Sequence, residues 1–147
     1  MVVAIGSDHG GYLYKELIKE KYGKELTFYD LGAHELDPAD DYVDFSIAVA
    51  EAVASGKAER GIFICRTGVG ASIAMNKVQK VFCGLAEGKT DCLLARKKNN
   101  INCLTFGADN VSKRKALAIV KTFLTTEFEG GRHQRRVDKI KKYESKK

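Results

Sequence analysis

The chain has 147 residues, of which 44% are hydrophobic and 30% are charged. This length fits one domain spanning residues 1–147, which would bury roughly two-thirds of the surface of the unfolded chain. Every uncharged apolar run is shorter than the roughly 20 residues that cross a bilayer, so the sequence excludes a membrane-spanning helix. Residues 1–9 contain no basic segment, so we expect no secretory signal peptide.

Short apolar segments alternate along the chain with helical patterns. The expected strands are residues 2–8, 26–32, 60–66, 81–87 and 101–107. The expected helices are residues 12–23, 45–56, 71–78, 90–99, 111–128 and 136–144. This alternation predicts an α/β fold, a three-layer α/β/α sandwich with a five-stranded parallel Rossmann-like sheet and a C-terminal helix. Ligands bind such sheets at the carboxyl ends of the strands.

The positive charge is concentrated near the C-terminus. Residues 113–147 hold 12 basic and four acidic side chains, whereas residues 1–112 carry a small negative excess. A local positive excess indicates an anionic partner, either a small phosphate or a nucleic acid. The segment lacks the interleaved aromatic side chains that bind nucleic acid, so we expect a small phosphate compound and no nucleic acid.

The four cysteines, at positions 65, 83, 92 and 103, form no Cys-x-x-Cys pair. Disulfide and zinc frameworks normally space their cysteines more closely. We therefore expect free thiols, no zinc framework built on the cysteines, and a location in the reducing cytoplasm. Cys83 and Cys103 lie in apolar runs, which is typical of core packing.

Cys65 ends an expected strand, directly before a glycine-rich turn, residues 68–72, that opens a helix. Backbone N–H groups and the positive end of a helix dipole favour a thiolate there, and Arg66 adds positive charge. The alternative is an inert cysteine buried in the strand. The turn could hold an oxyanion or a phosphate. It matches neither a dinucleotide fingerprint, because position 73 is Ile, nor a Walker A loop, nor a phosphatase loop, because position 71 is Ala.

Two further groups of polar residues could act on a phosphorylated substrate. Asp8 and His9 follow the first expected strand, where they could move protons or bind hydroxyl and phosphate oxygens. Asp8 could instead simply cap the next helix. Arg132 and Arg136 are four residues apart, so they share a helical face and could clamp a phosphate dianion, unless they are solvated surface residues.

Four segments together resemble the type B ribose-5-phosphate isomerases and their relatives, which include galactose-6-phosphate isomerase. The segments are GSDHGG (6–11), ICRTGVGASIAMNK (64–77), ARKKNNINCLTFG (95–107) and EGGRHQRRV (129–137). The resemblance implies a homodimer or dimer of dimers, a sugar-phosphate substrate and no metal or organic cofactor. It also implies interconversion of an aldose and a ketose phosphate through a cis-enediolate.

The resemblance assigns roles to individual residues. It implies that Cys65 is the proton-transfer base, and that Thr67 and Asp8 handle sugar hydroxyls and ring opening. Residues implied to bind the substrate are His9, Tyr42, Gly68, Val69, Gly70, Ala71, Ser72, Asn99, Arg132 and Arg136. Residues 98–99 would reach Cys65 of the partner subunit, so that activity would require a dimer.

The chain also departs from the family pattern. Arg66 stands where a Gly is usual, Lys98 where many members have the ring-opening His, Asp109 where an Arg is found, and Val43 where a Pro follows the Tyr. In one interpretation Lys98 replaces the histidine in a ribose-5-phosphate isomerase and Arg66 compensates for Asp109. In the other, the substrate is another sugar phosphate, such as a tetrose 4-phosphate or a hexose 6-phosphate. We favour the pentose; a non-catalytic phosphate-binding module is a third possibility.

Overall fold

The computed structural model describes residues 1–146, which contain five strands and six α-helices. The strands are β1 (Val2–Ser7), β2 (Thr27–Asp30), β3 (Arg60–Cys65), β4 (Cys83–Leu85) and β5 (Cys103–Gly107). The helices are α1 (Tyr12–Tyr22), α2 (Tyr42–Ala54), α3 (Val69–Met75), α4 (Lys89–Asn99), α5 (Lys113–Thr125) and α6 (Arg132–Glu144), with a short 3₁₀ helix, η1 (His9–Gly11). The predicted alternation of strands and helices is confirmed.

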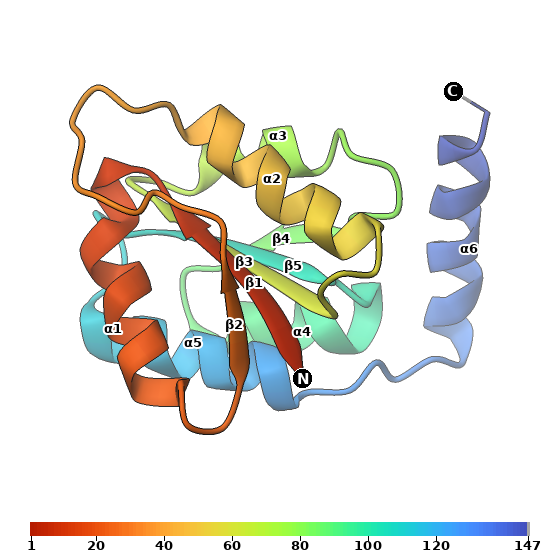
Figure 1. The fold of residues 1–147 in the computed structure, drawn as a ribbon. Coiled ribbons are helices and arrows are strands. Elements are labelled where there is room, and N and C mark those ends of the chain that lie inside the picture. The colour runs from red at the N-terminus through yellow and green to blue at the C-terminus, as the bar shows by residue number, and fades with distance from the viewer. Residues whose placement is uncertain (147) are drawn as a thin grey trace.

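The strands form one parallel sheet in the order β2-β1-β3-β5-β4. Helices α2 and α3 cover one face, and α1, α4 and α5 cover the other, which gives the predicted three layers (Figure 1). The central strands are buried on both faces, as their continuous apolar sequences indicate. The chain order reverses between β1 and β3, and the crevice at such a switch point is the usual ligand site of an open α/β sheet.

Strand β4, at the edge of the sheet, is shorter than the sequence predicts. The apolar run begins at residue 81, but β4 begins only at Cys83. The side chain of Asn102 accepts a hydrogen bond from the Phe82 N–H at 2.8 Å and donates one to the Lys80 carbonyl, also at 2.8 Å. Because this side chain satisfies the backbone groups that would otherwise extend the strand, regular pairing starts at Cys83, two residues after the predicted start.

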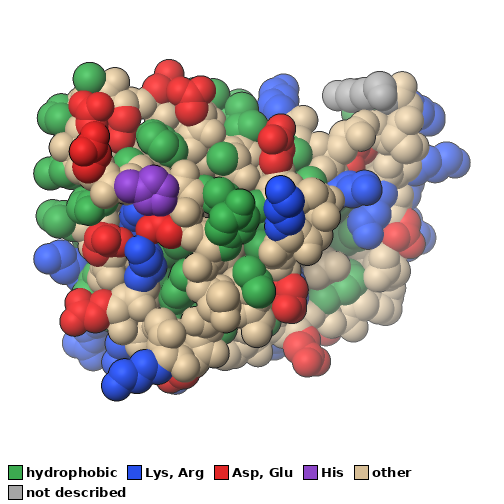
Figure 2. Space-filling model, in the orientation of Figure 1, with side chains coloured by type: hydrophobic (Ala, Val, Ile, Leu, Met, Phe, Trp, Pro, Cys, Tyr) green, Lys and Arg blue, Asp and Glu red, His purple; other side chains and the backbone are tan. Residues whose placement is uncertain are grey.

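The C-terminal helix α6 is longer than predicted and stands beside the sandwich. Gly130 and Gly131 have φ of +70° and +55°, and the helix begins directly after them, at Arg132 rather than at residue 136. Helix α6 lies at the side of the molecule opposite α1 (Figure 1). It contacts the body through His133 and Val137, which are 6% and 2% exposed. Lys and Arg side chains lie along its outer surface (Figure 2).

None of the helices formed by residues 1–146 combines the length and the apolar character that a bilayer span demands.

Candidate active site

The carboxyl ends of β1 and β3 bring Asp8 and Cys65 to one edge of the sheet. Ser7 of β1 pairs with Ile64 of β3, so the residues that follow them in sequence are neighbours in space. Asp8 is 6% exposed and Cys65 is 5% exposed. Asp8 and Cys65 therefore lie together at the carboxyl edge of the sheet, where the sequence analysis expected them.

The glycine-rich turn wraps around the sulfur of Cys65. The Gly68 N–H donates to Sγ at 3.1 Å, and Gly68 has φ of +83°, a left-handed conformation that favours glycine. Burial raises the pKa of the Cys65 thiol above its ordinary value, and the charge of Asp8 acts in the same direction. The N–H groups of Gly68, Thr67 and Ala71 act to lower this pKa, as the helix terminus predicts, but burial outweighs them.

Tyr42, at the start of α2, packs directly on this turn. A Cβ atom added at Gly70 would collide with the phenol ring and hydroxyl of Tyr42, so only glycine permits this approach. Thr67 is exposed, and its hydroxyl accepts a hydrogen bond from the Val69 N–H at 3.3 Å. Val69 and the partly buried Ser72 complete the turn. Residues 67–72 and Tyr42 therefore lie close to one another beside Cys65.

Asp8 caps η1, as the simpler sequence interpretation predicted. Its Oδ1 accepts hydrogen bonds from the N–H groups of Gly10 and Gly11 at 2.9 and 3.3 Å. Burial raises the pKa of Asp8, against the opposing effect of the Gly10 hydrogen bond and the His9 charge. The cap does not conflict with a role toward substrate, because a carboxylate has lone pairs beyond those used here.

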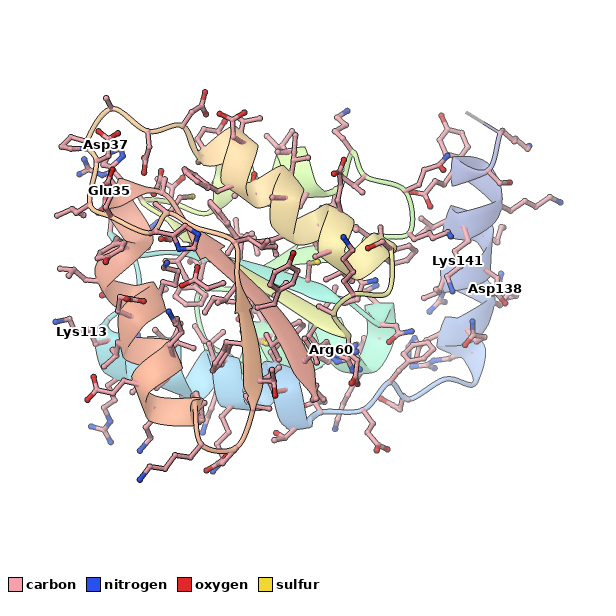
Figure 3. All side chains as sticks on the ribbon, in the orientation of Figure 1. Glu35, Asp37, Arg60, Lys113, Asp138 and Lys141 are labelled. Atoms are coloured by element: carbon pink, nitrogen blue, oxygen red, sulfur yellow. The ribbon has the colours of Figure 1, made fainter. Side chains whose placement is uncertain are left out.

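His9 is held by a residue that sequence reasoning missed. The His9 N–H donates to Oδ1 of Asp40 at 3.0 Å, and its ring Nδ1 lies 2.7 Å from the same oxygen. This hydrogen bond raises the pKa of His9 above its ordinary value. Asp40 lies in an acidic loop with Glu35 and Asp37 between β2 and α2 (Figure 3), and nothing in the sequence distinguishes it from its neighbours.

Two of the departures from the family pattern contact each other. Arg66 Nε donates to Asp109 Oδ2 at 3.1 Å, and both side chains are largely exposed. The stem of Arg66 also lies against Gly10, where a Cβ atom would collide with it. Arg66 therefore extends over the Asp8–Gly11 segment toward His9, and its guanidinium offsets the negative charge of Asp109.

One chain does not bring the remaining predicted residues to Cys65. Helix α4 runs from the carboxyl edge of the sheet back to the amino edge, and Lys98 and Asn99 lie exposed at its far end. Arg132 and Arg136 lie on α6 and are also exposed. They are one helical turn apart, as predicted, but they lie beyond the opposite side of the sheet (Figure 1).

Among residues 1–146, one cluster has side chains close enough together to hold a metal ion. It consists of Asp8, His9 and Asp40, whose possible ligand atoms lie within 4.8 Å of one another. One ring nitrogen and two carboxylate oxygens of this cluster already have protein partners. Nδ1 of His9 lies at hydrogen-bond distance from Asp40, and Oδ1 of Asp8 accepts two backbone N–H groups. These hydrogen bonds account for the arrangement, and we assign the cluster to hydrogen bonding rather than to metal binding.

A cavity of about 630 Å³ lies between the amino edge of the sheet and α6. Arg60 of β3 and Lys141 of α6 line its two sides (Figure 3). None of the predicted site residues lines it, and it holds no cysteine or histidine. The cavity is therefore separate from the cluster around Cys65.

Comparison with known proteins shows the family to which the chain is related. The model of the Ribose/Galactose Isomerase family matches residues 3–140. The structure of Clostridium thermocellum ribose-5-phosphate isomerase B superposes with a TM-score of 0.96 at 44% identity, covering 99% of each chain. Mycoplasma genitalium ribose-5-phosphate isomerase B, solved with bound ribulose-5-phosphate, gives a TM-score of 0.94 at 40% identity over 99% of this chain and 97% of that one. Ribose-5-phosphate isomerase B of Escherichia coli is 37% identical over 139 residues, 94% of this chain and 93% of the relative.

A family match across nearly the whole chain, together with Cys65, Asp8 and the glycine-rich turn at one sheet edge, leads to a single assignment. The chain belongs to the ribose/galactose isomerase family of sugar-phosphate isomerases.

Proposed function

We propose that the protein interconverts ribose 5-phosphate and ribulose 5-phosphate. The observation that carries the proposal is the position of Cys65, a thiol enclosed by backbone N–H groups beside a carboxylic residue at the sheet edge. The ribulose-5-phosphate bound to the Mycoplasma genitalium relative supports the choice of a pentose phosphate.

In the proposed reaction the Cys65 thiolate removes the proton from C2 of the open-chain aldose. The electron pair forms the C1–C2 double bond of a cis-enediolate, and negative charge moves to the former carbonyl oxygen. In the turn at residues 68–72, the N–H groups of Gly68 and Val69 already donate to Cys65 Sγ and Thr67 Oγ1, and the Gly70 N–H donates to that oxygen. The hydroxyl proton of O2 then moves to O1, and Cys65 returns its proton to C1 as the C2 carbonyl forms, which yields the ketose and regenerates the thiolate.

The phosphate would lie at the His9 end of the site. A cationic His9 and the guanidinium groups of Arg132 and Arg136 supply charge-assisted hydrogen bonds to a dianion. An unpaired Asp109 would repel the phosphate. The contact between Arg66 and Asp109 therefore supports the interpretation that the charge of Arg66 compensates for that of Asp109. Lys98 takes the place of the ring-opening acid and can donate a proton to the ring oxygen.

We further propose that two subunits share each site. Within one chain, Lys98, Asn99, Arg132 and Arg136 lie away from Cys65, so a partner must supply them. Exposed apolar side chains beside the glycine-rich turn support a partner there. Val69 and Ile73, one turn apart on α3, are 50% and 58% exposed.

A substrate panel in deuterium oxide tests the proposal. Ribose 5-phosphate, a tetrose 4-phosphate and a hexose 6-phosphate are each incubated with the enzyme, and solvent deuterium in the recovered sugar reports enediolate formation. We expect the fastest exchange and turnover with the pentose. Faster turnover of another sugar would replace the substrate, and phosphate binding without exchange on any sugar would indicate a non-catalytic module.

A further inference from the structure

Two hydrogen bonds attach His9 to Asp40, which lies 31 residues further along the chain. Both the backbone N–H and the ring nitrogen Nδ1 of His9 contact the same carboxylate oxygen. The Asp40 side chain is 8% exposed, and its Oδ2 is buried without a hydrogen-bond partner among residues 1–146. Two contacts of this kind, one on the backbone and one on the ring, restrict the imidazole to one orientation.

The contact with Asp40 also decides where the imidazole proton lies. An ionised carboxylate only accepts hydrogen bonds, so Nδ1 of His9 must carry a hydrogen. Nε2 of His9 has no hydrogen-bond partner within the described part of the chain. In neutral His9 this Nε2 is a bare acceptor, whereas in the imidazolium it is a second donor. Since a phosphate dianion needs a donor, His9 can bind it through Nε2 only when charged.

The charged groups that face His9 come from three segments. Asp40 in the β2–α2 loop raises the pKa of His9 through its hydrogen bond, and Asp8 at the end of β1 adds to this effect. Arg66, which follows β3, acts to lower the pKa, as does the loss of solvent around the ring, but the net shift is upward. The loop that carries Asp40 therefore favours the charge state that a phosphate requires.

We propose that Asp40 is a positioning residue of the phosphate-binding end of the site, which fixes the tautomer and orientation of the His9 imidazole so that Nε2 faces the substrate phosphate. The identity of the ligand rests on the proposed function. The tautomer and the orientation of His9 are properties of the free protein. Asp40 acts through His9 and does not touch the substrate.

The first test needs no variant. In ¹⁵N-labelled protein without substrate, the chemical shifts of the two ring nitrogens of His9 distinguish its tautomers. At a pH above the pKa of His9 we expect the hydrogen on Nδ1, although the free amino acid favours Nε2. A neutral His9 with its hydrogen on Nε2 would overturn the proposal, whatever the protein catalyses.

The second test compares Asp40→Asn with Asp37→Asn. Asn keeps the size of Asp40 but removes its charge, and Asp37 lies in the same loop with an exposed side chain that accepts a hydrogen bond from the Ala39 N–H. We expect Asp40→Asn to lower the pKa of His9 and to raise the KM for the sugar phosphate about tenfold, with little change in kcat. In the wild type, KM should rise as pH passes upward through the pKa of His9, and this rise should move to lower pH in Asp40→Asn. Asp37→Asn should change none of these quantities.

The outcomes separate this inference from the proposed function. If folded Asp40→Asn leaves the pKa of His9 and the pH profile of KM unchanged in an active isomerase, Asp40 has no positioning role and the function stands. If no sugar phosphate reacts, inorganic phosphate replaces it as the probe. A response of His9 Nε2 to phosphate in the wild type, lost in Asp40→Asn, supports the positioning role while the isomerase proposal fails. If Asp40→Asn does not fold, the tautomer in the wild type decides.

Discussion

At the scale of single residues, two opposing effects act on the pKa of the Cys65 thiol: backbone N–H groups lower it and burial raises it. The sequence predicts the N–H groups around it, because a glycine-rich turn before a helix exposes them. It does not predict how deeply the end of β3 is buried, which depends on the packing of α2 and α3 against the sheet. Burial prevails and raises the pKa of Cys65, so the thiol is protonated in most free molecules near neutral pH.

The proposed mechanism makes a prediction about Cys65. Replacing it with Ala should lower kcat by about 10²–10⁴-fold, because general-base proton transfer contributes that much, and should leave KM nearly unchanged. Since the active form is the thiolate and its pKa is raised, kcat of the wild type should increase with pH through and above the ordinary thiol pKa of roughly 8.5, while KM carries the titration of His9. Assays of steady-state rate against pH check both expectations.

Cys92→Ala is the matched control for this experiment. Cys92 is also fully buried, but it lies on α4 and its Sγ contacts the Ile119 carbonyl at 3.6 Å, on the other side of the sheet from α2 and α3. The Cys92→Ala variant should lower the stability of the protein and leave kcat unchanged. Equal turnover by the wild type and Cys65→Ala would remove Cys65 from the mechanism.

At the scale of elements, a buried ion pair fixes α1 to β2. Lys15 on α1 is 1% exposed, and its Nζ lies 3.0 and 2.9 Å from the two carboxylate oxygens of Asp30. Lys19 Nζ lies 2.7 Å from Asp30, and Lys15 also donates to the Ala33 carbonyl. The apolar pattern of residues 12–23 predicts the helix, but it does not predict that a lysine occupies the buried face. The partner of that lysine, Asp30, lies on β2, the next element along the chain.

Asp30→Asn should destabilise the protein by about 3–5 kcal/mol, because it leaves the Lys15 charge buried without its counterion. Burial acts to raise the pKa of Asp30, but hydrogen bonds from Lys19, the Gly32 N–H and Lys15 hold it below its usual value. A lowered pKa means that this stabilisation is complete above the unfolded-state pKa of about 3.9 and is lost as pH falls through the folded-state value. Urea unfolding at several pH values measures the difference. The control, Asp37→Asn, changes an exposed side chain and should lower the free energy of unfolding by less than about 1 kcal/mol. An equal loss of stability in the two variants would contradict the stabilising role of the Lys15–Asp30 pair.

Element boundaries were predictable where a local signal was present. Helix α3 begins at Val69, inside the glycine-rich turn, two residues earlier than the predicted start at residue 71. The start of α6 at Arg132 follows from two left-handed glycines, but a Gly-Gly pair is equally compatible with a longer link. The shortened β4 depends on the side chain of Asn102, which approaches from a segment 20 residues away. Contacts of this kind do not follow from periodicity.

At the scale of the whole molecule, the predicted site separates into two groups. Cys65, Asp8 and His9 lie at the carboxyl edge of the sheet, and the basic residues of α4 and α6 lie elsewhere. The sequence identified members of both groups by residue type and by family resemblance. The residue types alone could not show which of these residues lie near Cys65 within one chain, because that depends on where the chain places α4 and α6 relative to the sheet. Only the family resemblance implied that residues 98–99 belong with Cys65 of a partner subunit.

Subunit complementation tests whether two chains share each site. In a shared site, Cys65→Ala removes the base from one half and Arg136→Ala removes a phosphate ligand from the other, so each pure variant should be strongly impaired. If the two variants are mixed in equal amounts, dissociated and reassembled, half of the dimers should be mixed. Each mixed dimer has one site that carries both changes and one site that is intact. The mixture should therefore recover about a quarter of the wild-type rate per subunit. Sites built within single chains would instead give the average of the two pure variants, with no recovery on mixing.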